Sequence, residues 1–392
     1  MRDGRVVVVG GGPAGSVTAL ELARSGVEVT VVERASFPRR KVCGEYLSPG
    51  TLAVLDALGV GADVRRLGQP IAGVRLTAGV LDPIDLPFEE PALAVARATL
   101  DALLLDAARG AGAEVVHARA EDLRFGAGGA EGVVIRDHAG TRHDLRAAVV
   151  VGADGTGSVV ARRLGLARRT SGGRRFALGG HYAGFGVLYG IVEMFADEGG
   201  YFAINPLSED CVNAMVVLPE RLLAGTRTVD ALVCERACEL GRGLRSLDRV
   251  SRIGPRAAVG PLAFDVTGSV AHGALLVGDA AGTLDPFTGQ GVFLAISGAR
   301  AAARATLQVL RTPARARQAL AAYERAQRRE LGARRRLSAL VTMLVRNPVL
   351  GRRVAARITS TPRAARALVA AVGGSGSVEA ALAPWSLAAL FL

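Results

Sequence analysis

Short apolar runs and helical patterns alternate along the first part of the chain. Residues 5–9 include a β-branched run, which is typical of a short strand buried on both faces. A helical pattern follows over 14–25 and ends at Gly26, and a second apolar run covers 27–32. A strand, a helix and a strand in this order predict a βαβ unit in a parallel sheet.

The same pattern of an apolar run followed by a helical segment occurs at two later places. An apolar run at 149–151 is followed by a helical pattern that reaches Leu164. A second run at 274–277 leads, through a glycine-rich stretch, into a helical pattern over 292–306. We therefore expect both segments to belong to the same α/β domain as the first βαβ unit.

The middle of the chain has a different pattern. Small and apolar residues alternate over 176–192 and over 211–218, and 200–206 is typical of a strand that ends in a turn. Such alternation indicates antiparallel strands with one face packed against the rest of the protein. We expect residues 71–91 to add a strand pair, because they precede the return to the first domain.

Helices are expected in the C-terminal part. Segments over 313–345, 348–358 and 362–372 each begin at a proline, and the apolar tail over 379–392 is too short to span a membrane. The first of these helices carries an apolar stripe at helical spacing, formed by Leu337, Leu340, Val341 and Leu344.

Two interpretations of this helical region remain open. One is that its basic amphipathic helices lie on an anionic membrane surface, which would place the protein at the inner face of that membrane. The other is a helical layer packed on the first domain, with arginine stems covering apolar surface. We favour the packed layer.

Composition and charge narrow the class of protein. Half of the 392 residues are hydrophobic, 50 are glycine and 21% are charged, which excludes a small single domain, a collagen-like chain and a disordered chain. The net charge is +12, but residues 300–366 hold 17 arginines against Glu324 and Glu330, so they carry +15 and the remainder carries −3. Tyr323 is the one aromatic residue of this segment, so we expect no nucleic-acid partner.

Cysteine and histidine indicate neither a disulfide framework nor a metal site. The four cysteines are too few for a framework in this chain, and we expect Cys234 and Cys238 to be buried thiols of one helix rather than half a metal site. The five histidines lack metal-ligand spacing. No secretory signal follows Met1 and no apolar run reaches about 18 residues, so we expect a cytoplasmic protein.

The clearest motif lies at the first strand-to-helix turn. It has the three glycines of a dinucleotide-binding turn, with two helix-opening residues between them: Gly10, Gly12, Pro13, Ala14 and Gly15. The first glycine permits a tight turn, and the second lets the backbone approach a pyrophosphate at the helix N-terminus. The third lets the helix pack closely on the strand. Glu33 ends the second strand, where a carboxylate accepts hydrogen bonds from a ribose.

Two later segments separate FAD from NAD. Residues 149–155 read Val-Val-Val-Gly-Ala-Asp-Gly, and residues 278–291 begin Gly-Asp-Ala-Ala-Gly and end Pro-Phe-Thr-Gly-Gln-Gly. With the first motif, they resemble in order and spacing the three FAD signatures of the FAD-dependent group A oxidoreductases. This is the superfamily of para-hydroxybenzoate hydroxylase and geranylgeranyl reductase, and the resemblance covers most of the chain.

The resemblance implies a bound FAD and an NAD(P)H that visits transiently. The acid of the third signature binds the ribityl hydroxyls in the family, which implies this role for Asp279. The turn that follows would lie beside the isoalloxazine ring, where backbone N–H groups stabilise negative charge. The FAD-binding residues implied are Gly10, Gly12, Pro13, Ala14, Gly15, Glu33, Arg34, Lys41, Cys43, Arg97, Ala120, Asp154, Gly155, Gly278, Asp279, Pro286, Gly289, Gln290 and Gly291.

Three of these positions have more specific expectations. Arg97 begins a helical pattern similar to that of the family's arginine near the flavin, with a surface arginine as the alternative. Asp154 would support the FAD region and the approach of NAD(P)H. Ala120 would contact the adenine through its backbone.

The branch of the superfamily is indicated by two departures from the hydroxylases. The third signature reads Gly-Asp-Ala-Ala-Gly where hydroxylases commonly end it in histidine, and residues 41–49 resemble the Cys-Gly loop of the geranylgeranyl reductase branch. That loop passes the substrate cavity in relatives. The cavity candidates are Cys43, Glu45 and Tyr46 from the loop, and Phe185, Phe195, Tyr201, Phe202 and Asn205 from the middle sheet.

The fold that follows is α/β: a Rossmann-type, glutathione reductase-like FAD-binding domain, an antiparallel β-sheet substrate domain and a C-terminal helical region. We expect the FAD-binding domain to be discontinuous, over 1–70, 92–170 and 265–310. The substrate domain would comprise 71–91 and 171–264, and the helical region 311–392.

Three functions are compatible with these residues. The favoured one is an FAD-dependent, NAD(P)H-using monooxygenase that hydroxylates or epoxidises an apolar or aromatic substrate of secondary metabolism. The second is a geranylgeranyl reductase-like enzyme that reduces alkene bonds of an isoprenoid lipid. The third is a flavin-binding, membrane-associated partner without catalysis. Substrate identity, NADH against NADPH and oligomeric state are left open.

Overall fold

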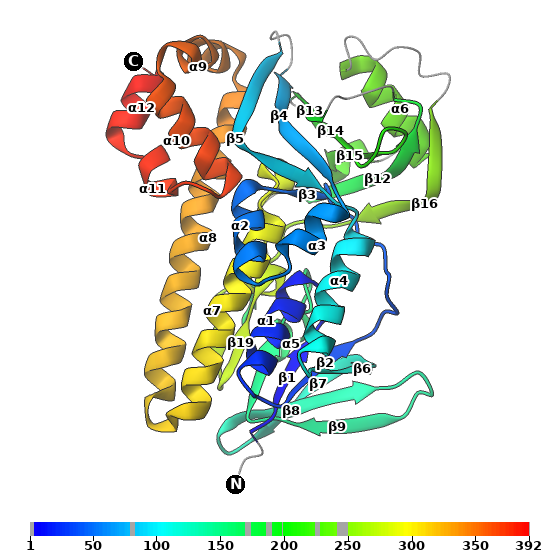
Figure 1. Ribbon diagram of the computed structural model, residues 1–392, viewed down its shortest axis with the longest axis vertical. Coiled ribbons are helices and arrows are strands. Elements are labelled where there is room, and N and C mark those ends of the chain that lie inside the picture. The colour runs from blue at the N-terminus through cyan, green and yellow to red at the C-terminus, as the bar shows by residue number, and fades with distance from the viewer. Residues whose placement is uncertain are drawn as a thin grey trace.

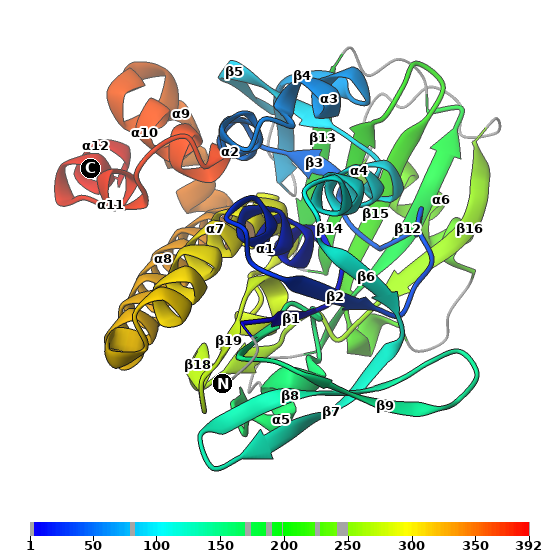
Figure 2. The ribbon, with the colours of Figure 1, turned by 60° about the horizontal axis from the view of Figure 1, so that its bottom comes forward.

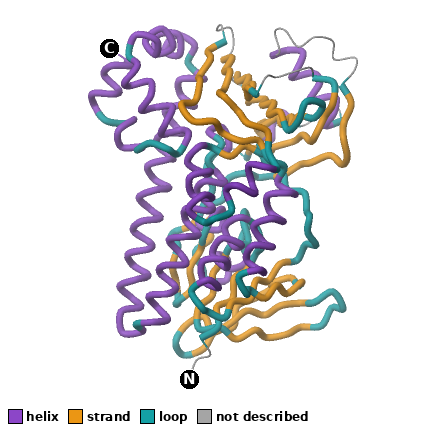
Figure 3. The backbone as a smooth tube through the Cα atoms, viewed as in Figure 1, coloured by secondary structure: helices purple, strands orange, loops and turns teal. Residues whose placement is uncertain are grey.

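The protein is described here from a computed structural model. The structure describes residues 4–78, 83–168, 174–185, 190–197, 199–223, 228–240 and 250–391. Strands gather in two main sheets, one at each end of the molecule, and long helices run along one side (Figures 1 and 3). The predicted α/β class is confirmed.

A six-stranded sheet forms the base of the nucleotide-binding part. Its strand order is β18 (Val270–Ala271), β19 (Ala274–Leu276), β10 (Val149–Gly152), β1 (Val6–Val9), β2 (Val29–Glu33) and β6 (Glu114–His117). Neighbouring strands are parallel except for the β18–β19 pair. Since β19, β10 and β1 are adjacent, the three motifs that follow them meet at one edge of the sheet, where such folds bind their ligands.

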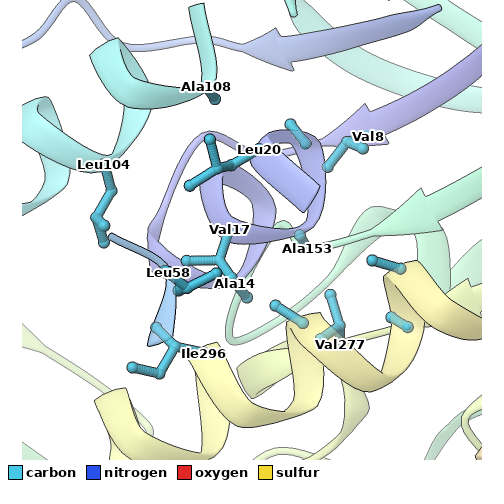
Figure 4. Packing of buried hydrophobic residues seen from close by; sticks show 14 of the residues in the cluster. Val8, Ala14, Val17, Leu20, Leu58, Leu104, Ala108, Ala153, Val277 and Ile296 are labelled. Carbon is cyan, nitrogen blue, oxygen red and sulfur yellow. The ribbon is translucent and has the colours of Figure 1, made fainter. Parts of the chain in front are cut away.

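Alternate residues of β1 pack into two different layers. Val6 and Val8 face the helices α1 (Pro13–Arg24), α4 (Arg97–Gly110) and α7 (Gly291–Arg311), and Figure 4 shows α1 between the other two. Val7 and Val9 face α5 (Val159–Arg163) and a small sheet of β7 (Arg119–Gly126), β8 (Gly129–Arg136) and β9 (Arg142–Arg146), which is seen clearly in Figure 2. Burial on both faces explains the continuous valine run.

A second sheet of eight strands lies at the opposite end of the molecule (Figure 1). Its order is β16 (Ser251–Val259), β12 (Arg175–Ala183), β15 (Val212–Pro219), β14 (Gly200–Pro206), β13 (Ile191–Asp197), β4 (Gln69–Ala78), β5 (Ile84–Ala94) and β3 (Tyr46–Leu47). The sequence predicted a purely antiparallel sheet, and this was wrong at one place: β13 pairs with β4 in parallel. The β4–β5 pair comes from a distant part of the chain, so no hairpin turn constrains its direction beside β13.

The two faces of this sheet are covered differently. Phe202 and Ile204 of β14 pack with α6 (Val229–Leu240), whereas Tyr201 and Asn205 point to the opposite face. Adjacent strand residues cannot share a face. The cavity assignment was therefore wrong for three aromatic residues, which lie in the core against α6: Phe185, Phe195 and Phe202.

The C-terminal helices form a layer along α7. They are α8 (Ala316–Arg346), α9 (Pro348–Ser360), α10 (Pro362–Gly373), α11 (Val378–Ala381) and α12 (Pro384–Phe391). α8 runs beside α7, and α9 to α12 cluster next to β4 and β5 (Figure 1). The predicted apolar stripe packs inward: Leu337 contacts α10 and α11, and Val341 faces the large sheet.

Smaller elements connect these layers. They are α2 (Pro49–Ala57), α3 (Gly61–Arg66) and the short pair β11 (Ala167–Arg168) with β17 (Asp265–Val266). Among the described residues, no helix has the length and hydropathy that crossing a membrane requires. Cys234 and Cys238 both lie on α6, but Cys234 is only half-buried and Cys238 is exposed, so the prediction of two buried thiols was wrong. No cluster of three metal-ligating side chains occurs among the described residues.

Candidate cofactor and substrate site

The three motifs touch one another at the edge of the parallel sheet. Gly10 has a φ of +103°, and a Cβ there would lie 2.5 Å from the Ala153 carbonyl oxygen. A Cβ on Gly15 would lie 1.8 Å from the Gly10 carbonyl oxygen, and one on Gly278 would lie 2.9 Å from the Ala14 Cβ. Glycine is required where backbones approach this closely. The motifs therefore form one cradle around the N-terminus of α1.

Glu33 ends β2 beside the glycine turn. Its buried carboxylate accepts hydrogen bonds from the backbone N–H groups of Gly11 and Ala35, each at 2.8 Å. This fixes the side chain beside the glycine turn. Arg34 follows Glu33 and is exposed. Ala120 lies half-buried on β7. The Ala118 N–H, just before β7, donates a hydrogen bond to the Glu33 carbonyl and so holds the start of β7 beside the end of β2.

Asp154 makes hydrogen bonds at the start of α5. Its carboxylate accepts hydrogen bonds from the Ser158 hydroxyl and the Val159 N–H, so it caps the N-terminus of α5. Burial raises the pKa of this carboxyl, and the Ser158 hydrogen bond opposes that rise. Gly155 next to it has a φ of +75°, and a Cβ there would lie 3.5 Å from Lys41 Nζ.

A basic cluster lies opposite the glycine cradle. Arg97 is buried rather than on the surface, and Asp101 holds its guanidinium with bonds of 2.7 and 2.9 Å. Arg39 reaches the same carboxylate at 3.3 Å, and its Nη2 would also lie 3.3 Å from a Cβ on Gly12. Lys41, the chain's single lysine, completes the cluster.

The charges in this cluster oppose one another. Burial lowers the pKa of Lys41, and Arg97 and Arg39 lower it further, while Asp279 acts in the opposite direction. Burial also disfavours the charge on Arg97, but Asp101 and Cys43 outweigh it and raise its pKa. The cluster thus presents more positive than negative charge to the cradle, which suits an anionic ligand.

The turn before α7 leaves a helix N-terminus open. Gly289 is in the left-handed region at φ +66°, and a Cβ there would lie 2.8 Å from a ring carbon of Tyr46. Gly291 begins α7, is exposed, and has open space around its Cα. The partial positive charge of a 21-residue helix therefore points out at this turn. Asp279 lies in the preceding short helix, Gly278–Ala281.

The Gln290 side chain ties the turn to α10 through its Nε2, while its buried Oε1 has no hydrogen-bond partner among the described residues. Its Nε2 donates to the carbonyl oxygens of Ala371 and Val372, at 2.9 and 2.8 Å, and so ties the turn to the C-terminal end of α10. The Ala371 carbonyl also accepts the Gly374 N–H at 3.2 Å and Arg334 Nη1 at 3.3 Å, so Gln290 adds to an end of α10 that is already hydrogen-bonded.

These residues fit FAD. The glycine cradle and Glu33 suit the adenosine diphosphate half, and the buried Arg39 Nε has no hydrogen-bond partner among the described residues, as expected of a group that waits for a phosphate. Lys41 and Asp279 lie close enough for the carboxylate to affect the pKa of the lysine. The open N-terminus of α7, with its partial positive charge, suits the isoalloxazine ring, which carries negative charge when it is reduced.

A cavity of about 290 Å³ adjoins the turn. It lies between the inner face of the large sheet and α8, α9 and α10, and no charged residue lines it among those described. Pro286–Gly289 forms part of its wall. Of the predicted cavity residues, the lining includes Cys43, Tyr46, Tyr201 and Asn205.

Two asparagines hold the Cys43–Glu45 loop against the sheet. Asn213 Nδ2 donates to the Cys43 carbonyl at 2.6 Å, and Asn205 Nδ2 donates to the carbonyls of Gly44 and Glu45, both at 2.9 Å. The two asparagines are direct neighbours on β14 and β15. Their amide groups therefore fix the loop that separates the cofactor groove from the cavity.

Glu45 belongs to the scaffold of the loop, and its assignment to the cavity lining was wrong. It is 6% exposed at a φ of +55°, and its carboxylate accepts the Arg97 N–H at 2.8 Å and meets His181 Nε2 at 2.6 Å. The strained backbone turns the Glu45 side chain away from the cavity and toward β12 and α4.

Residues 3–335 match the family described as FAD binding domain. The chain belongs to this family. It is an FAD-dependent oxidoreductase, as the resemblance implied.

Two relatives show the range of reactions around this chain. The menaquinone reductase of Mycolicibacterium smegmatis is 30% identical over 317 residues, which cover 76% of this chain and 75% of that protein. The 6-methylpretetramide 4-monooxygenase of Streptomyces rimosus is 56% identical over 63 residues, covering 16% of this chain and 15% of that protein. A geranylgeranyl bacteriochlorophyll reductase-like protein of Thermoplasma acidophilum shares the fold, with a TM-score of 0.79, 23% identity and coverage of 99% and 96%.

Sequence reasoning missed three residues that shape this site. Arg39 could have been suspected, because Arg39, Arg40 and Lys41 form a basic run just after the ribose-binding strand. His181 and Asn213 carried no such signal. They act on a loop more than 130 residues away in the chain, a contact that no local pattern encodes.

The asparagine clamp gives a first prediction. We expect Asn205→Leu to leave the Gly44 carbonyl without its donor, to remove one of two donors from the Glu45 carbonyl, and to lower the free energy of unfolding by about 1–3 kcal/mol. Urea denaturation of the FAD-loaded protein measures this. Gln318→Leu, on the exposed face of α8, is the control, and an equal loss in both variants would contradict the clamp.

Proposed function

We propose that the protein is a monooxygenase that inserts one oxygen atom into a ring of a lipophilic substrate, using FAD and NAD(P)H. The observation that carries this proposal is the distribution of polar groups in the cavity. Thr288 belongs to the turn at Pro286–Gly289 and Tyr201 packs on Phe287 of that turn, whereas most of the lining is apolar. A substrate with a polar ring and a long apolar chain would match this arrangement of polar and apolar lining residues.

The polar end is well defined. Asn205 and Asn213 lie side by side there, and Tyr201 packs edge-on against Phe287 with ring centroids 5.1 Å apart. Both Nδ2 groups serve the loop, and Asn205 Oδ1 is buried with no hydrogen-bond partner among the described residues. A buried acceptor without a partner supports a ligand that brings a hydroxyl group.

The remaining lining supports an apolar tail. It comes from β4 and β5 on one side and from α8, α9 and α10 on the other, and includes Leu86, Phe88, Leu344, Val354 and Leu368. Such a lining excludes water from the reacting atoms, which matters because water would divert the reaction.

Bound FAD would supply electrons from NAD(P)H to O2. The balance is one substrate, one O2, one NAD(P)H and one proton giving hydroxylated substrate, NAD(P)⁺ and water. The chain's own part is to hold the ring at the turn, to exclude water and to place the N-terminus of α7 where negative charge develops.

Alkene reduction is the second candidate. The observation in its favour is that the relative covering three quarters of the chain is named a menaquinone reductase, and that the long apolar wall suits an isoprenoid chain equally well. The two reactions differ in their need for oxygen.

Turnover with and without oxygen separates the candidates. As probes we would use pentadecylresorcinol, a phenol with a long tail, and menaquinone, each with NADPH or NADH. We expect the resorcinol to gain one labelled atom from isotopic O2, and no product under argon. Product from menaquinone under argon, with two hydrogens added to a side-chain double bond after any quinol has been reoxidised, would overturn oxygenation in favour of alkene reduction. Failure of NAD(P)H to bleach the flavin with either probe would count against both enzymes.

A cavity variant ties the reaction to this site. We expect Ala203→Trp, which fills the lining of β14, to lower turnover at least about tenfold while FAD stays bound, because binding requires the space. Ala326→Trp on the exposed face of α8 is the matched control.

A further inference from the structure

The outer face of α9 combines charge with exposed apolar surface. Four exposed residues of α9 are spaced at i, i+3, i+4 and i+8, so they form one stripe along the helix: Val349, Arg352, Arg353 and Arg357. Val349 is 66% exposed, the largest value among the exposed large hydrophobic residues of the described chain. The stripe therefore places an exposed aliphatic side chain on the same face as three exposed arginines.

The neighbouring helix adds an aromatic residue. Trp385 of α12 is 44% exposed, and the Arg363 guanidinium of α10 lies 5.0 Å from the centre of its ring. α12 packs against both α9 and α10 (Figure 1). We call Val349, Arg352, Arg353, Arg363 and Trp385 the docking surface.

The helices of this surface carry charge of one sign along the chain, and Glu89 of β5 pairs with one of their arginines, Arg366, at 3.4 Å. Residues 331–378 contain nine arginines and no acidic residue. The charge is therefore concentrated on the helices that form the docking surface, while the parts of the chain outside the basic segment are slightly acidic.

The inner faces of the same helices form the cavity wall. Gly351 and Val354 of α9, Ala365 and Leu368 of α10 and Leu344 of α8 line it. One layer of helices thus separates the apolar cavity from the basic surface.

We propose that the docking surface binds an anionic membrane and brings the cavity wall against the lipid from which an apolar substrate is taken. Arginine contributes attraction to anionic head groups, and Val349 and Trp385 contribute insertion at the interface, as in helices that lie in the membrane surface. A nucleic-acid partner would use the arginines and leave the aliphatic side chain without a role. The inference holds for either reaction, since both candidate substrates are lipophilic.

The chain carries its own probe for this inference. Trp385 is the only tryptophan, so its emission reports on this surface alone. The FAD-loaded protein is mixed with vesicles of phosphatidylcholine containing phosphatidylglycerol, and with vesicles of phosphatidylcholine alone. We expect a blue shift of the emission, quenching by brominated lipid and co-sedimentation with the anionic vesicles, all weaker at high salt.

Matched charge reversals test the location of the surface. Arg352→Glu with Arg353→Glu should lower the partition onto anionic vesicles at least about tenfold, because each arginine near the surface contributes about 1 kcal/mol. Arg317→Glu with Arg325→Glu makes the same change of charge at the far end of α8 and should lower it much less. Val349→Asp should abolish the blue shift.

Three results would overturn the proposal. They are no binding to anionic vesicles at low salt, an equal loss in the two double variants, and salt-dependent binding to duplex DNA without binding to vesicles. Flavin reduction by NAD(P)H in detergent, measured on every variant, shows whether the enzyme itself is intact, so loss of docking is distinguished from loss of function.

Discussion

Replacing Gly12 by aspartate is expected to abolish FAD binding while leaving the fold intact. Gly12 is the N-cap of α1 at φ −75°, a position and conformation that aspartate favours. A Cβ there has only Arg39 Nη2 within 4 Å. The carboxylate would therefore occupy the anion site and pair with Arg39. Repulsion of a pyrophosphate charge at about 4 Å amounts to about 4 kcal/mol, or roughly a thousandfold in the dissociation constant of FAD.

Titration of the apoprotein with FAD measures this constant, and urea denaturation of the apoprotein should show equal or greater stability. Gly12→Asn has nearly the same size without the charge and should lose far less affinity. Gly110→Asp introduces the same charge where no atom lies within 4 Å and should change nothing. Wild-type affinity in Gly12→Asp would exclude this turn as the phosphate site.

Asp101→Ala should cause the largest loss of stability of any single change proposed. The Asp101 side chain is 0% exposed and holds Arg97 by two hydrogen bonds and Arg39 by an ion pair. Its removal leaves the buried Arg97 charge without a partner, and breaking such pairs costs about 3–5 kcal/mol. The shift of the urea midpoint of the FAD-loaded protein reports this loss.

The exposed pair of Arg75 and Asp85 gives the comparison. Both side chains are exposed, so Asp85→Ala should cost at most about 1 kcal/mol. In Arg97→Met with Asp101→Leu, both charges are replaced by apolar groups, and much of the stability should return. Similar losses in Asp101→Ala and Asp85→Ala would mean that solvent reaches the buried cluster.

The residues that could be predicted from the sequence share one property: their constraints are local. The valine run, the Gly10–Gly15 turn and Glu33 are set by sterics and hydrogen bonding within about thirty residues, so their geometry could be written down before any tertiary contact was known. The order of the three motifs then implied that they meet. The same reasoning failed for Phe202, which was assigned to the cavity together with its neighbour Tyr201, because a strand pattern shows that neighbours face opposite ways but not which face lines the cavity.

Distant contacts decided the rest. Arg39 reaches the glycine cradle, His181 holds Glu45 and Gln290 anchors α10 because folding brings these positions together. The basic C-terminal segment shows the division most clearly. Its charge and amphipathic period could be read along the chain, but only the packed structure turned the apolar stripe of α8 inward to the cavity and left Val349 and Trp385 of α9 and α12 in solvent. Periodicity determines that a helix has two faces, and the burial of neighbouring elements selects which one meets water.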